Sequence, residues 1–125
     1  MTTYSIVIPG VPPRKNRRHI IVRNRLINSR EFKLFSKLLG EAWKAAGHPK
    51  IDSGLWRLTV HSTWPRTRHL DQPVPLGDVD APVSCILDAL QEAQILDDDA
   101  RVMALQATKD RGKHPCVSIA MVALT

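Results

Sequence analysis

Hydrophobic and polar residues alternate along several short stretches of this chain, and a period of two is typical of β-strands. The clearest case is residues 55–64, where apolar side chains share one side and polar side chains take the other. Residues 4–8 alternate in the same way until a Pro-Gly pair interrupts them. Further strands are predicted at residues 101–107 and 116–124, and a short hairpin at residues 20–22 and 26–27.

Two stretches show the helical period instead. Ser29 is a suitable N-cap, because its hydroxyl can accept a hydrogen bond from an amide of the first turn. Apolar residues then recur three or four positions apart until Gly47 ends the helix. A second helix is predicted over residues 82–93, with a proline in its first turn, where the missing N–H has no partner to lose. Its inward stripe consists of Val83, Ile86, Leu87 and Leu90.

These elements predict an α/β fold in a single small domain over residues 1–125, with a mixed sheet of about four to five strands packed with two main helices. Residues 109–113 form a turn short enough for an antiparallel hairpin between the last two strands. Residues 65–79 contain several prolines and are expected to form a loop.

Charge is distributed unevenly along the chain, whose formal net charge is +6. The first fifty residues carry eleven Lys and Arg residues against only Glu31 and Glu41. Between Asp71 and Asp99 there are eight acidic residues and no Lys or Arg. Such segregation raises repulsion within each block, which a cation on the acids and a polyanion on the bases would offset. The sequence therefore favours a metal-dependent enzyme that acts on nucleic acid.

Four of the acidic residues flank the second predicted helix. Asp78 and Asp80 lie two apart in a stretch expected to be extended, so both carboxylates should point to one side. Asp98 and Asp99 follow the helix, and only tertiary packing can bring them back, because twelve helical residues span roughly 18 Å. Converging carboxylates repel by about 4 kcal/mol at 4 Å, so they need a cation, and their oxygens suit Mg²⁺ or Mn²⁺. A solvated acidic surface is the alternative.

The order of these residues resembles the signature of the RusA family of Holliday junction resolvases. Asp78-Val79-Asp80 is followed by Ile86-Leu87-Asp88-Ala89-Leu90, and then by Asp98-Asp99-Ala100-Arg101-Val102 before a strand. The family pattern runs D-x-D-N-x-x-K, then a helix with L-D-A-L, then D-D before a strand. The likeness covers nearly the whole chain, from its opening strand to its closing one.

The resemblance implies a RusA-like homodimer that is a Mg²⁺-dependent endonuclease, with Mn²⁺ as an alternative ion, and that resolves four-way DNA junctions by paired symmetric cuts in recombination and repair. Its catalytic, metal-binding carboxylates fall on Asp78, Asp80 and Asp99, and Asp98 is a neighbouring candidate ligand. The implied partners are branched DNA and a second copy of the chain, with no membrane and no nucleotide cofactor. A bacterial or phage-encoded protein of this kind is expected in the cytoplasm.

Two positions depart from the family pattern: Ala81 stands where the family has Asn, and Ser84 where it has Lys. An ammonium at position 84 would neutralise phosphate charge in the transition state, which a serine hydroxyl cannot do. A non-catalytic or weakly catalytic protein that binds four-way junctions, or a nuclease for other branched DNA, is therefore the alternative interpretation.

Basic side chains supply the candidate DNA contacts. The densest cluster lies in the turn-rich segment after the first strand, where phosphate contact is favoured over a merely solvated loop by the overall charge. The candidates are Arg14, Lys15, Arg17, Arg18, Arg68 and Lys109.

Overall fold

The structure, a computed structural model, describes residues 2–10, 12–13, 19–22, 25–69, 73–75 and 78–124. The helices are α1 (Arg30–Ala45), α2 (Ala81–Glu92) and the short 3₁₀ helix η2 (Asp99–Arg101). The strands are β1 (Thr3–Pro9), β2 (His19–Val22), β3 (Arg25–Asn28), β4 (Leu55–Trp64), β5 (Thr67–His69), β6 (Pro73–Pro75), β7 (Val102–Arg111) and β8 (Cys116–Leu124). This is the predicted small α/β arrangement, with a mixed sheet and two main helices.

The main sheet has four strands in the order β1-β8-β4-β7. Its β1–β8 and β8–β4 pairs are antiparallel, whereas β4 and β7 run parallel. The predicted hairpin between the last two strands is therefore wrong, because β4 lies between them. The burial of β4 explains this: Leu58 and Val60 are 0% and 1% exposed, so this strand lies in the centre of the sheet with a partner on each side.

Two small hairpins lie outside the main sheet. The backbones of β2 and β3 pair antiparallel, which confirms the short hairpin predicted there. The stretch expected to be a loop contains a second hairpin, in which three residues of β5 pair with three residues of β6. Sequence patterning missed it because β6 begins and ends with proline, which removes the alternation that marks a strand.

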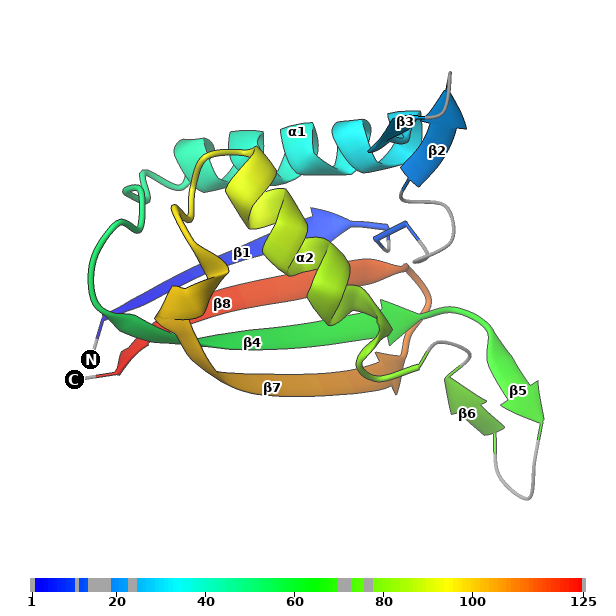
Figure 1. Cartoon of the computed structure of the whole chain (residues 1–125). Coiled ribbons are helices and arrows are strands. Elements are labelled where there is room, and N and C mark those ends of the chain that lie inside the picture. The colour runs from blue at the N-terminus through cyan, green and yellow to red at the C-terminus, as the bar shows by residue number, and fades with distance from the viewer. Residues whose placement is uncertain are drawn as a thin grey trace.

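Both helices pack on one face of the sheet (Figure 1). The Ser29 hydroxyl caps α1 as predicted, accepting a hydrogen bond of 3.1 Å from the Phe32 amide. The helix ends where Gly47 adopts a φ of 74°, a conformation that favours glycine. The core between the helices and the sheet is formed by the following fully buried side chains: Leu39, Ile86, Leu90, Leu58, Ile119 and Met121. Among the described residues, no helix combines the length and apolarity needed to cross a membrane.

Candidate functional site

Asp78 and Asp80 lie at the amino end of α2, and both are exposed. The Ala81 amide donates to the Asp78 carbonyl over 3.2 Å, and the Val83 amide donates to the Asp80 carbonyl over 3.1 Å. The predicted extended stretch is therefore a turn, because hydrogen bonding that leads into the helix already begins at Asp78. Asp80 is the N-cap of α2, but its carboxylate makes no capping hydrogen bond. Its carboxylate lies at the positive end of the helix dipole, which stabilises the negative charge of the side chain.

The second group of acids, Asp97, Asp98 and Asp99, is called here the acidic turn. The Arg101 guanidinium donates to both carboxylate oxygens of Asp97, over 2.6 and 2.9 Å. This hydrogen bonding by Arg101 lowers the pKa of the Asp97 carboxyl below its ordinary value. Asp98 caps η2 by accepting a 2.8 Å hydrogen bond from the Ala100 amide. All three side chains are exposed; Asp97 and Asp98 make these local contacts, and Asp99 lies at the start of η2.

The two acidic groups lie at opposite ends of the sheet. The acidic turn is held at the start of β4, because the Asp97 amide donates to the Ile51 carbonyl over 3.2 Å and Val102 pairs with Trp56. Asp78 instead follows the β5–β6 hairpin, which extends from the far end of β4. Ten strand residues separate these ends by roughly 30 Å, and Figure 1 shows the two segments well apart.

The structure therefore does not bring the carboxylate of Asp99 together with those of Asp78 and Asp80 within one chain. Across the part of the chain that the structure describes, no group of three His, Cys, Asp or Glu side chains is placed to hold a metal ion. The reason is that α2 carries the chain away from Asp80, and the loop after it then pairs with Ile51 instead of turning back. A magnesium ion held by three carboxylates of a single protomer does not fit this arrangement.

The two positions that differ from the RusA pattern, Ala81 and Ser84, both lie at the amino end of α2. Ala81 is the first residue of the helix and is exposed. Ser84 is also exposed and stands four residues after Asp80, so the two positions are neighbours on the helix surface. A lysine at position 84 would therefore place its ammonium close to the Asp80 carboxylate.

Most of the basic side chains chosen from the sequence cannot be placed. Arg14, Lys15, Arg17 and Arg18 lie outside the described residues, as does the side chain of Arg68. Lys109 is described, and it is half-buried on β7 opposite Ser62 of β4.

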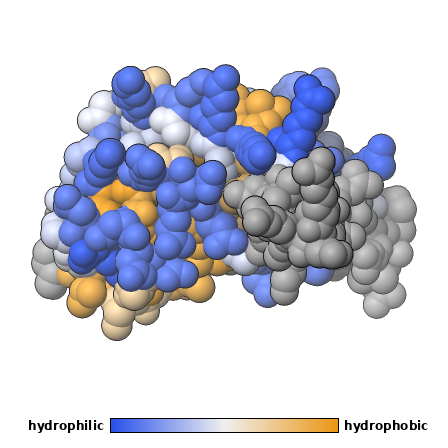
Figure 2. All heavy atoms as spheres, turned by 45° about the horizontal axis from the view of Figure 1, so that its top comes forward, coloured by the Kyte–Doolittle hydropathy of each residue, from blue (hydrophilic) through white to orange (hydrophobic). Residues whose placement is uncertain are grey.

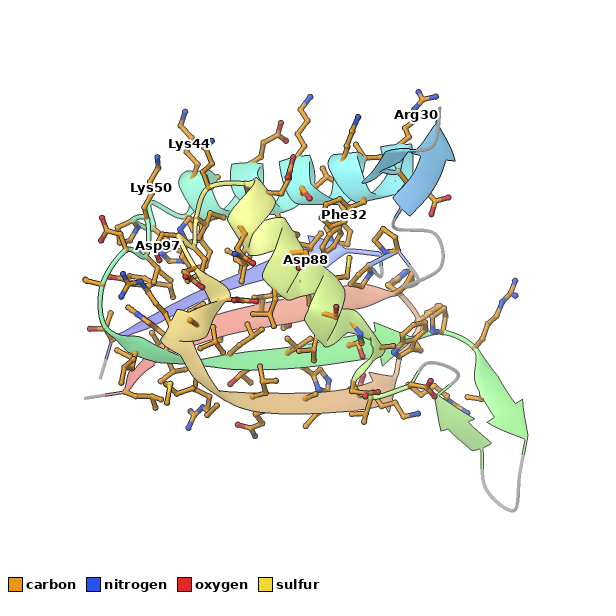
Figure 3. The ribbon with its side chains drawn as sticks, viewed as in Figure 1. Arg30, Phe32, Lys44, Lys50, Asp88 and Asp97 are labelled. Atoms are coloured by element: carbon orange, nitrogen blue, oxygen red, sulfur yellow. The ribbon has the colours of Figure 1, made fainter. Side chains whose placement is uncertain are left out.

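A basic ridge that the sequence reasoning missed runs along α1, and it is formed by the exposed side chains of Arg30, Lys33, Lys37 and Lys44. Figure 3 shows Arg30 and Lys44 pointing away from the sheet, while Phe32 points toward it. The signal was present in the sequence, since spacings of three, four and seven residues place side chains on one face of a helix. Lys33, Lys37 and Lys44 also line a hollow of about 410 Å³ beside α2, together with the acids Glu41 and Glu92.

A second cluster that was not predicted lies on the sheet face opposite the helices. His61 Nδ1 is 2.5 Å from the Thr108 hydroxyl, and His61 Nε2 is 3.2 Å from an Asp110 oxygen. Hydrogen bonds from the Thr63 hydroxyl and from His61 lower the pKa of the Asp110 carboxyl. These contacts join β4 to the edge strand β7. The side chains of His61 and Asp110 are 38% and 54% exposed. We assign this cluster a structural role in holding the two strands together.

Comparison with the models of known protein families finds no match, and no curated protein matches this chain. Function must therefore be argued from the residues and the structure.

Proposed function

We propose that this protein is an endonuclease of the RusA type that binds and cuts four-way DNA junctions. The single observation that carries the proposal is the order of the acids around α2. Asp78 and Asp80 immediately precede the helix and are exposed, and Asp99 is exposed at the start of the element before β7. Exposed carboxylates in an order that resembles the signature of the RusA family support a catalytic role.

The distribution of positive charge supports DNA as the partner. The formal net charge is +6, and the α1 ridge presents four exposed cations along one side of a helix. Figure 2 shows that hydrophilic side chains dominate the surface over the helices. Such a surface matches the regular negative charges of a phosphate backbone, which supply most of the affinity in binding that does not read sequence.

The separation of the acids adds a condition to the proposal. Magnesium is commonly held by one or two carboxylates together with substrate phosphates, rather than by a cage made only of protein. Asp78 and Asp80 can supply such a pair, and the remaining ligands then come from DNA phosphates or from a second protomer. A homodimer is also required by the reaction, because two symmetric cuts need two sites related by a two-fold axis.

A non-catalytic protein that binds four-way junctions is the second candidate. It is favoured by the absence of a three-carboxylate group in the described residues and by the engagement of Asp97 and Asp98 in local contacts. Serine at position 84, where the family has lysine, points in the same direction.

Cleavage and binding of a labelled synthetic four-way junction separate the two candidates. The protein is incubated with the junction, with linear duplex and with single strands, each with Mg²⁺ or with EDTA. The proposal predicts cuts in the junction that require Mg²⁺, and a shifted band without cuts in EDTA. Binding without cuts under every condition, Mn²⁺ included, would support the non-catalytic candidate instead.

Asparagine substitutions test which acids take part. Asp78→Asn and Asp80→Asn should each lower the cutting rate about 10²-fold or more, the scale for removing one group that acts on transition-state charge. Junction affinity should stay the same or rise, because a negative charge near phosphate is removed. Asp52→Asn is the matched control, since Asp52 is an exposed acid outside the family pattern. Equal loss of cutting in all three variants would refute the assignment.

A further inference from the structure

A second hollow, of about 430 Å³, lies where β4 and β7 end and is called here the β7 hollow. The described residues that line it are Pro65, Thr67, Arg111, Gly112 and Lys113. None of these side chains is acidic, whereas the hollow beside α1 also carries Glu41 and Glu92. Of the two hollows, the β7 hollow is therefore the better suited to an anion.

Arg111 and Lys113 supply the positive charge of the β7 hollow. Both side chains are exposed, and among the described residues neither forms an ion pair with a carboxylate. The adjacent acid, Asp110, instead accepts hydrogen bonds from the Thr63 hydroxyl and from His61. The nearest carboxylate along the chain is therefore held by β4 and not by the two cations.

The register of β4 and β7 places Arg111 on the face of the sheet that the helices cover. Arg111 pairs with Trp64, which shares this face with the buried residues Leu58 and Val60 because side chains alternate along a strand. Asp110 pairs with Thr63 and lies on the opposite face. Arg111 is thus on the side of the sheet where α2 begins.

Gly112 holds the turn with the two cations against the end of β4. Its amide donates to the Trp64 carbonyl over 3.2 Å. A Cβ atom at position 112 would collide with Cγ2 of Thr63. Glycine is therefore needed for this close approach, which fixes the turn that carries Arg111 and Lys113 beside the hollow.

The β7 hollow lies close to the acids at the amino end of α2. Thr67 lines the hollow and pairs with Pro75 of β6, and β6 packs beside β7. Asp78 follows Pro75 by three residues, so the Cα atoms of these two residues are at most about 11 Å apart. Figure 1 likewise shows the hairpin and the start of α2 at the end of the sheet where β4 and β7 finish.

We propose that Arg111 and Lys113 bind a phosphodiester of the junction DNA in the β7 hollow and hold it beside Asp78 and Asp80. This inference deepens the proposed function and rests on it. A guanidinium donates paired hydrogen bonds to phosphate oxygens, and an ammonium acts as a point charge. Because the phosphate and the two carboxylates are all negative, cations at this position reduce the repulsion between them.

The salt dependence of junction binding in EDTA tests the phosphate contacts without cutting. The double variant Arg111→Gln/Lys113→Gln should make the slope of log K against log KCl less steep by about 1.8 units, because each lost phosphate contact removes about 0.9. Lys50→Gln is the charge control. Lys50 is exposed and precedes Ile51, which pairs with the acidic turn at the other end of the sheet. This control should leave the slope unchanged.

The cutting rate at saturating protein tests whether the bound phosphate is the one beside the acids. With Mg²⁺, the double variant should cut about 10²-fold more slowly, and more protein should not restore the rate. Gly112→Ala keeps both charges but displaces the turn, so it should also slow cutting. Adding Thr63→Ser removes Cγ2 and keeps the hydroxyl, so the combined variant should recover the wild-type rate.

Each failure has a distinct outcome. A wild-type chain that binds and cuts the junction, with equal slope and equal rate in the double variant, would overturn this inference and leave the proposed function standing. A less steep slope with an unchanged rate at saturation would also overturn it, because the phosphate would then lie away from the acids. A wild-type chain that binds but never cuts, with the less steep slope still seen in the double variant, would support the phosphate contact and count against the endonuclease.

Discussion

The α1 ridge offers a quantitative test of DNA binding. We consider the triple substitution of Lys33, Lys37 and Lys44 by glutamine, which removes three positive charges and keeps the side chains polar. All three residues are exposed, and none belongs to the buried face of α1. The substitution should therefore change the binding of a polyanion with little effect on the fold.

The size of the effect follows from the geometry of the helix. Lys44 is eleven positions after Lys33, so the three lysines are distributed over roughly 16 Å of α1. Successive phosphates of one strand advance 3.4 Å along the DNA axis, so this length spans several of them and three separate contacts fit. Each phosphate contact contributes about −0.9 to the slope of log K against log salt. Removing all three should make the slope less steep by about 2.7 units.

Fluorescence anisotropy with a labelled junction, measured in EDTA at a series of KCl concentrations, gives the slope for the wild-type and the triple variant. Thermal unfolding of both proteins checks that the fold is intact. An equal slope in two proteins of equal stability would refute the assignment of α1 to the DNA-binding surface. A slope that changes by one unit only would show that a single lysine of the three contacts phosphate.

Three further predictions concern catalysis, pH and the core. Ser84→Lys should raise junction cutting at unchanged affinity, because the ammonium would stand beside the Asp80 carboxylate; equal rates would refute this reading. Hydrogen bonding by Arg101 lowers the pKa of the Asp97 carboxyl in the folded state below 3.8, so the stabilisation is present above pH 3.8 and is lost as the pH falls through the lower folded pKa. The urea midpoints of Arg101→Gln and wild-type should therefore differ at pH 6, and the difference should shrink as the pH is lowered below 3.8. Ile86→Ala should reduce the free energy of unfolding by about 2–5 kcal/mol, whereas Leu34→Ala, at a 57% exposed position, should change it by about 0.5 kcal/mol or less.

Much of the fold could be predicted from local patterns. Ser29, Gly47 and the apolar stripe between them specify α1, because capping and helical periodicity act within a few residues. The alternation of apolar and polar residues in β4 likewise predicts which side of the strand is buried and which is half-buried. The pairing of the strands could not be predicted in this way. The position of β4 between β7 and β8 depends on contacts between residues far apart in the chain, and the short turn after β7 suggested a hairpin instead.

The candidate site shows the same division. The sequence identified the acids, and the structure shows Asp78, Asp80 and Asp99 exposed on the surface. The sequence could not show that the loop after α2 forms backbone hydrogen bonds with Ile51. This pairing keeps the acidic turn away from the start of α2. The α1 ridge, in contrast, could be predicted from the helical spacing of its basic residues, although the cluster at Arg14–Arg18 is denser in the sequence.

The most direct test of the central claim is a map of the cut sites on a four-way junction whose four strands are labelled separately. With Mg²⁺, the proposed endonuclease should make paired nicks at symmetric positions on two opposing strands of the junction, and none on linear duplex. A junction that is bound tightly but left intact in Mg²⁺ and in Mn²⁺, at protein concentrations that saturate it, would contradict the account.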